Sequence, residues 1–178
     1  MELSRSELRE VAGYAVACAR PALAIFEREC ADDRRPRAAI DAAQAFADGG
    51  ERTRALRDSA WAAHRAAQDA RDAGQAAASD AARAAGHAVG AAFLHPLPRA
   101  TQVKHILGSA AYAARAFELS AGDNSAVGLD QLAESRILAP PVVVDVLRRY
   151  PSAPSGGGRV GELIRILDAS LRRAGADR

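Results

Sequence analysis

Two pairs of side chains have types that can bind an anion or transfer a proton. His64 lies three residues after Trp61, and His87 lies four residues after Arg83. Residues three or four apart share one face of an α-helix, so each pair would act together. A guanidinium binds a carboxylate through two parallel hydrogen bonds, and an imidazole can exchange a proton near pH 7. The pairs therefore indicate an anion-binding or proton-transfer site, although we expect Trp61 itself to lie in the core.

Two further stripes of polar residues have helical spacing. Arg37 and Asp41 are four residues apart, and His105 and Tyr112 are seven apart with Gly108 between them. Alanine and glycine flank these stripes, and glycine lets backbones approach closely. We therefore expect seven side chains to converge in one binding site: Arg37, Asp41, His64, Arg83, His87, His105 and Tyr112. The alternatives are a surface ion pair between Arg37 and Asp41, and histidines that pack in the core or lie at the surface.

Arg83 lies between alanines in the most specific of these motifs. We expect it to have buried polar partners, so that its replacement by alanine would cost about 1–3 kcal/mol by leaving them unpaired. Arg54, close to Glu51 at a helix start, is expected to be exposed. Its loss should change the free energy of unfolding by no more than about 0.5 kcal/mol.

The three histidines on helical stripes also raise the question of a metal. Three imidazoles can bind zinc, but the chain has no HExxH and no Glu-x-x-His pair, and Cys18 and Cys30 lack CxxC spacing. A GxSxG nucleophile motif and a GxxxxGK[ST] phosphate loop are also missing. We therefore expect no bound metal and no cofactor, assign no catalytic residue, and favour a protein that is not an enzyme.

Composition favours closely packed helices. About a quarter of the 178 residues are alanine, the best helix former, and only 4% are aromatic. A β-sandwich or barrel would need more β-branched and aromatic side chains. The net charge of +2 argues against a nucleic acid or a membrane as partner. The charged N-terminal sequence and the cysteine usage lead us to expect a cytoplasmic protein.

Periodicity, proline and glycine predict the elements that position the polar stripes. The predicted helices cover residues 4–30 with a break at Pro21, 36–48, 51–73, 75–94, 99–121, 127–138, 140–150 and 160–173. We expect one all-α domain over 1–178. It would be a compact alanine-rich multi-helix bundle over about 4–121, with shorter C-terminal helices over about 126–174.

The motifs resemble those of the Imm-5-like immunity proteins of bacterial polymorphic toxin systems. The shared segments are RPRAAIDAA at 35–43, AAH at 62–64, ARAAGHAV at 82–89, HILG at 105–108 and AYAARA at 111–116. Their order and spacing agree from about residue 8 to about residue 120. The resemblance implies a toxin protein as partner.

Three functions fit these observations. The first is a non-enzymatic immunity protein that binds and neutralises a cognate toxin in the cytoplasm. The second is a small-molecule-binding or catalytic bundle, whose arginines and histidines hold a small anionic ligand in a pocket of about 300 Å³ or more. The third is a structural helical module.

Overall fold

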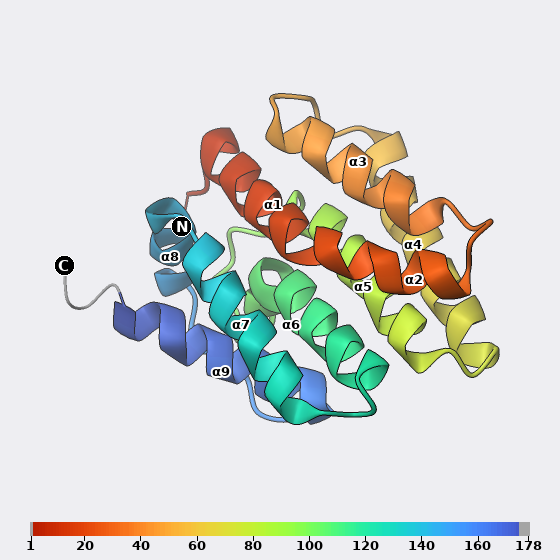
Figure 1. The fold of residues 1–178 in the computed structure, drawn as a ribbon. Coiled ribbons are helices and arrows are strands. Elements are labelled where there is room, and N and C mark those ends of the chain that lie inside the picture. The colour runs from red at the N-terminus through yellow and green to blue at the C-terminus, as the bar shows by residue number, and fades with distance from the viewer. Residues whose placement is uncertain (1, 175–178) are drawn as a thin grey trace.

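The computed structural model describes residues 2–174, which form helices and no β-strand. The α-helices are α1 (Arg5–Ala19), α2 (Leu23–Glu29), α3 (Arg35–Ala47), α4 (Arg54–Asp72), α5 (Ala76–Ala91), α6 (Val103–Ser120), α7 (Ser125–Leu138), α8 (Pro141–Arg148) and α9 (Gly158–Ala174). Short 3-10 turns, η1 (Arg20–Ala22) and η2 (Ala100–Gln102), precede α2 and α6. The predicted all-α fold class is confirmed (Figure 1).

Proline divides the first predicted helix into α1 and α2. α1 ends at Ala19, Pro21 lies in η1, and α2 continues in nearly the same direction (Figure 1). A proline inside an α-helix removes an N–H donor and its ring clashes with the preceding turn. The tighter 3-10 turn accommodates the ring, so the chain changes its winding at Pro21 without turning back.

Side-chain caps determine where α1 and α4 begin. Ser4 and Glu7 form a reciprocal capping box at the start of α1. The Thr53 hydroxyl accepts a backbone N–H from the first turn of α4 at 3.1 Å. Such a cap satisfies one of the free N–H groups at a helix start. α4 therefore begins at Arg54, three residues after the predicted start at Glu51.

The connection between α5 and α6 is longer than predicted. α5 ends at Ala91 and α6 begins at Val103, where the sequence predicted Leu94 and Arg99. Backbone hydrogen bonds between residues three apart form the turn after α5. One of them runs from the Leu94 N–H to the Ala91 carbonyl oxygen, at 3.3 Å. Helix ends commonly tighten into such turns, which explains the difference in bounds.

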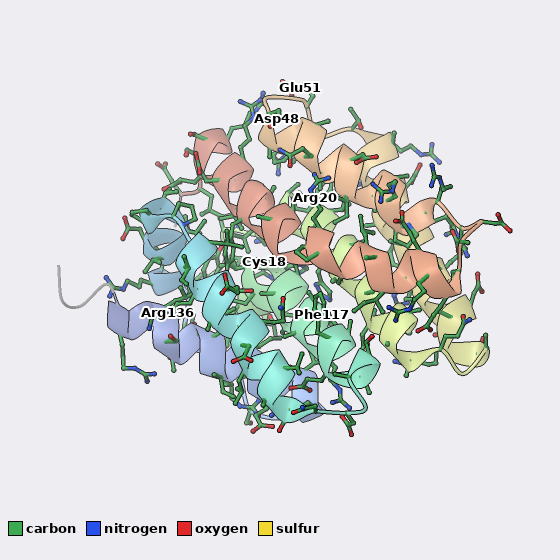
Figure 2. All side chains as sticks on the ribbon, viewed as in Figure 1. Cys18, Arg20, Asp48, Glu51, Phe117 and Arg136 are labelled. Carbon is green, nitrogen blue, oxygen red and sulfur yellow. The ribbon has the colours of Figure 1, made fainter. Side chains whose placement is uncertain are left out.

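α5 is the central helix and packs against α1, α2, α3, α4 and α6. Its buried face is mostly alanine, including Ala81 and Ala85, so the neighbouring helices approach it closely. Figure 2 shows Asp48 and Glu51 at the outer edge of the molecule and Cys18, which is buried, near the middle of the view. Among residues 2–174, no helix has both the length and the apolar character needed to cross a bilayer.

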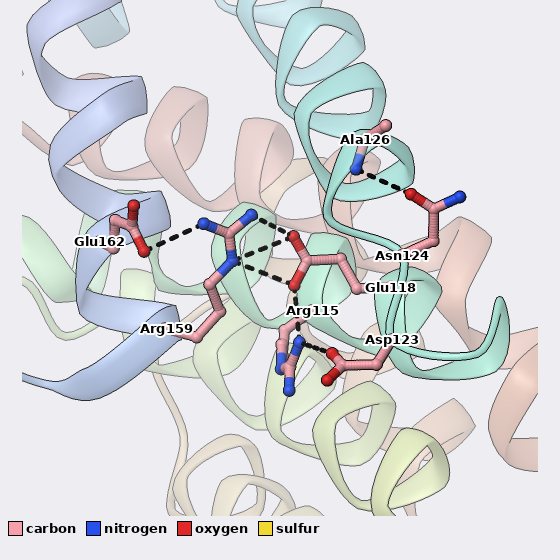
Figure 3. Close-up of polar contacts among 7 residues, drawn as sticks. All are labelled: Arg115, Glu118, Asp123, Asn124, Ala126, Arg159 and Glu162. Carbon is pink, nitrogen blue, oxygen red and sulfur yellow. Dashed lines mark hydrogen bonds and ion pairs between the residues drawn. The ribbon is translucent and has the colours of Figure 1, made fainter.

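An ion-pair network around one buried carboxylate joins α9 to α6 (Figure 3). Glu118 of α6 is fully buried, and its carboxylate accepts hydrogen bonds from Arg159 Nη2 at 2.5 Å and Arg115 Nη1 at 2.8 Å. Gly128 of α7 lies directly against this carboxylate, because an added Cβ would overlap it. Helices α6, α7 and α9 therefore meet around one charged side chain.

Candidate functional site

Helices α4, α5 and α6 form the wall of an open cavity of about 220 Å³, which we call the histidine hollow. Its lining residues are Ala60, Trp61, His64, Arg83, Gly86, His87, Gly90 and His105. Four of the seven predicted site residues therefore border one cavity: His64, Arg83, His87 and His105. They reach it from three different helices.

Glycines lie where α5 meets α6 and where α5 meets α4, and the glycine on α6 provides space that His87 needs. Gly108 of α6 faces His87 of α5, and a Cβ at this position would lie 2.8 Å from His87 Nδ1. Gly86 faces α4, where an added Cβ would lie 3.6 Å from the Ala60 carbonyl oxygen. The glycine of the HILG motif thus makes room for the histidine of the ARAAGHAV motif.

Tyr112, a fifth predicted site residue, extends the site beyond His87. The two rings stack with centroids 5.0 Å apart and an angle of 16° between their planes. Arg83 Cζ lies 5.9 Å from the Tyr112 ring centroid, and Lys104 Nζ lies 5.7 Å from it. A cation within about 6 Å of an aromatic ring is attracted to its π-electrons. Tyr112 thus contacts one imidazole and two cations.

His87 and His105 are held neutral at physiological pH. Burial, together with the positive charge of Lys104 and nearby basic side chains, lowers the pKa of His87 to about 3. Burial and Lys104 also lower the pKa of His105. A neutral imidazole has one N–H donor and one acceptor nitrogen. The fixed positive charge of the histidine hollow therefore comes from Arg83 and not from these histidines.

Arg83 is a partly buried cation without an anionic partner. Its Nε is buried and has no hydrogen-bond acceptor, and Arg83 forms no ion pair within residues 2–174. Asp80 lies one turn earlier on α5, and burial raises the pKa of its carboxyl despite the opposing charges of Arg83 and Arg115. The expectation of buried partners for Arg83 is wrong. Replacing Arg83 would leave no hydrogen-bonded partner behind, so the predicted loss of stability no longer follows.

Arg37 and Asp41 lie outside the histidine hollow. Arg37 instead forms a two-pronged ion pair with Glu27 of α2, with Nε–Oε1 at 2.5 Å and Nη2–Oε2 at 2.7 Å. The Arg37 guanidinium keeps the pKa of Glu27 below its ordinary value against the effect of burial. Asp41 is exposed. The loop between α2 and α3 creates this pairing, and helical spacing within α3 contains no signal for it.

Trp61 is exposed, which corrects the expectation that it lies in the core. Its exposed fraction is 60%, and its ring meets His64 edge-on with centroids 6.4 Å apart. The buried face of α4 is formed by Leu56, Ala63, Ala66, Ala67 and Ala70. This alanine spacing was the sequence signal that Trp61 lies off the buried face. Sequence reasoning also missed Lys104, which adds a second cation beside Tyr112.

The arrangement is suited to binding an anion. No three His, Cys, Asp or Glu side chains in the described part of the chain are grouped so that they could hold a metal ion. The histidine hollow instead combines one free guanidinium with neutral imidazoles and an exposed indole. A guanidinium of this kind binds carboxylate or phosphate oxygens by charge-assisted hydrogen bonds.

We expect Gly108→Ala to lower the free energy of unfolding by about 1–2 kcal/mol. Its Cβ would crowd the His87 ring, which stacks on Tyr112, and such overpacking costs about 1–3 kcal/mol. This cost exceeds the gain of up to about 1 kcal/mol from better helix propensity.

Gly86→Ala is the matched control for Gly108→Ala. Its Cβ would meet only ordinary contacts at 3.6 and 3.7 Å, so it should stabilise the fold by up to about 1 kcal/mol. Urea unfolding followed by circular dichroism measures both variants. Equal shifts in the same direction would show that the close approach of Gly108 to His87 is not important.

A comparison with known families identifies the chain. The model of the family described as "Imm-5 like putative immunity protein" matches residues 1–138. The chain belongs to this family. No curated protein and no solved structure matches the chain.

The match to the Imm-5-like family ends at Leu138, the last residue of α7, beyond the motif pattern that ended near residue 120. α8 and α9 thus lie outside the matched region, yet the segment that follows α8 reaches the site. A second cavity of about 110 Å³ is bordered by Tyr112, Lys104, the 154–157 loop and the first turns of α9. Tyr112 therefore connects the histidine hollow with a part of the chain outside the family match.

Proposed function

We propose that this member of the Imm-5-like family is an immunity protein that binds and neutralises a cognate bacterial toxin in the cytoplasm. Membership in the family carries the proposal. The histidine hollow supports it, because Trp61 is exposed there beside Arg83, which lacks an anionic partner. Tryptophan and arginine are enriched among the few residues that dominate the energy of protein interfaces. Cys18 and Cys30 are both free thiols, as is usual for proteins of a reducing compartment.

The histidine hollow fits protein binding better than a small-molecule or catalytic role. Its volume of about 220 Å³ is below the roughly 300–1,000 Å³ of typical ligand pockets. A general base works best when its pKa lies near the working pH, whereas the pKa of His87 is about 3. These two observations favour the immunity protein over the alternative of a small-molecule-binding or catalytic bundle.

Co-expression tests the proposal. Each toxin-like reading frame next to the gene is expressed from an inducible promoter in a bacterial host, with and without this chain. We expect growth to be rescued by the chain, and the two proteins to co-purify from the cytoplasmic fraction as a stoichiometric complex. Continued toxicity of every such candidate in the presence of folded chain would contradict the proposal.

We expect Trp61→Ala to weaken binding of the toxin by about 2 kcal/mol or more, which is roughly thirtyfold in Kd. The exposed indole would be buried in the complex, and its loss removes that contact without disturbing the core. Ile137→Ala on α7 is the matched control, since Ile137 is 75% exposed and lies at a different groove, between α7 and α9. Calorimetric titration measures both. A larger effect at Ile137 would place the interface on α7 and α9.

A further inference from the structure

We infer that the histidine hollow binds a carboxylate, that Arg83 pairs with it, and that an acidic side chain of the partner protein supplies it. This inference rests on the proposed function, and it specifies which chemical groups meet where the partner protein contacts the histidine hollow. It follows from the charge, the free hydrogen-bonding atoms and the size of the cavity.

The charge of the histidine hollow calls for an anion. Arg83 is the charged residue in its lining, and no Asp or Glu lines the cavity. The buried Nε of Arg83 has no acceptor, although buried donors in proteins are nearly always paired. Lys104, whose Nζ lies 5.7 Å from the Tyr112 ring centroid, adds to the positive potential. A ligand with a negative oxygen would supply the counter-charge that the lining of the histidine hollow does not give to Arg83.

The free donors match a carboxylate better than a phosphate. Arg83 can donate two parallel hydrogen bonds to the two oxygens of a carboxylate. His105 also lines the cavity, and its neutral imidazole can donate one hydrogen bond from the ring nitrogen that carries the proton. A phosphate carries more charge and more acceptor oxygens than one guanidinium and neutral imidazoles can satisfy.

The size and shape of the histidine hollow favour a side chain as the source of the carboxylate. The cavity is open and about 220 Å³ in volume, so it would leave a free metabolite largely exposed. Trp61 at its rim offers an apolar surface for the residues around an inserted side chain. An aspartate or glutamate of a protein partner would reach Arg83 while the partner's surface covers the indole.

Trp61 makes the inference measurable, because it is the single tryptophan of the chain and lines the cavity. Its fluorescence is followed at pH 7 and constant ionic strength during titration with N-acetylglutamate, used as its α-methylamide so that the side chain carries the single carboxylate. N-acetylglutamine as the same α-methylamide, which has no carboxylate, is titrated in parallel, as are inorganic phosphate and citrate. The variants are Arg83→Gln and, as the charge-matched control, Arg54→Gln, whose wild-type side chain is 92% exposed. Thermal unfolding of each variant establishes that it is folded.

We expect saturable binding of N-acetylglutamate in the millimolar range by the wild type and by Arg54→Gln. Arg83→Gln should weaken it at least tenfold, and N-acetylglutamine should give no saturable response. Equal binding by folded Arg83→Gln, or no response to N-acetylglutamate, would overturn the inference. If phosphate bound more tightly than N-acetylglutamate, the ligand would not be a carboxylate. If citrate bound in the micromolar range, the carboxylate would come from a free metabolite and not from a side chain of a partner protein.

The titration and the co-expression experiment fail independently. Carboxylate binding without rescue of growth would overturn the toxin proposal. Rescue of growth without carboxylate binding would overturn only the assignment made for Arg83.

Discussion

Gly128→Ala is expected to lower the free energy of unfolding by about 2–3 kcal/mol. A Cβ at Gly128 would lie 2.5 Å from Glu118 Cδ and Cγ and would overlap the carboxylate oxygen. Glu118 cannot move aside easily, because it is fully buried and is held by Arg115 and Arg159. Overpacking typically costs about 1–3 kcal/mol, and breaking a buried ion pair costs more, which outweighs the gain in helix propensity.

Gly13→Ala is the control for Gly128→Ala. Gly13 also lies inside a helix, but its added Cβ would meet only Ala47 Cβ at 3.6 Å. Chemical denaturation should therefore show no loss for Gly13→Ala and a clear loss for Gly128→Ala. If Gly128→Ala were as stable as the wild type, α7 would not pack against Glu118 as described.

The second large effect is a loss of stability between pH 7 and pH 5. Burial lowers the pKa of His87 to about 3, whereas an unfolded histidine has a pKa of about 6.5. Between these values the unfolded state binds the proton and the folded state does not, so acidification favours unfolding. Each pH unit below about 6.5 lowers the free energy of unfolding by up to about 1.4 kcal/mol. The total loss at pH 5 is therefore about 2 kcal/mol. His105 acts in the same direction, since its pKa is also lowered.

Carboxylates contribute to acid unfolding in a different pH range. The Arg149 side chain and the Ser4 backbone N–H lower the pKa of Glu7 to about 2. Burial raises the pKa of Glu118, but Arg159 and Arg115 outweigh it and keep that pKa below its ordinary value. The stability from these two groups is present above about pH 4.5 and is lost as the pH falls through their folded-state values. Asp80, whose pKa burial raises, acts in the opposite direction, because its folded state takes up a proton at a higher pH than its unfolded state. A loss of stability from pH 7 to pH 5 therefore reports the histidines, whose effect must exceed that of Asp80.

Urea unfolding of His87→Gln at pH 7 and pH 5 tests the histidine effect. The variant should lose much of the pH dependence, whatever its stability at pH 7, because the slope with pH reports proton binding alone. His64→Gln, which replaces an exposed imidazole, is the matched control and should retain the wild-type slope. An unchanged slope in His87→Gln would mean that His87 is not buried as a neutral ring.

The fold could be predicted well because local signals determine most helix ends. Pro21, the Gly49–Gly50 pair and Gly74 act on the backbone next to them, and the structure places helix breaks at each. Glu118 is a residue whose burial local sequence signals could not predict. Near the end of a helix it has the pattern of a surface residue, and its partner Arg159 is 41 residues further along the chain. Only the packing of α9 reveals that this carboxylate is buried.

The candidate site was predictable where two of its residues lie on the same face of one helix. Arg83 and His87 share a face of α5, and both line the histidine hollow. Arg37 has the same kind of spacing to Asp41, but its partner is Glu27, which a loop brings to it. Helical spacing says which residues share a face, while the packing of helices decides what that face meets. For this reason the sequence could not show that Arg83 has no partner.

The alanines and glycines beneath the histidine hollow have a consequence for the entropy of association. Alanine and glycine have no side-chain rotamers to lose when a partner docks, whereas each long side chain that becomes ordered costs about 0.5–1.5 kcal/mol. On this chain, the rotamers still to be restricted belong chiefly to exposed groups such as Trp61 and Lys104. The surface is thus already ordered before contact. If toxins are the partners, as proposed above, differences in their affinity should then reflect how much order each toxin must itself acquire.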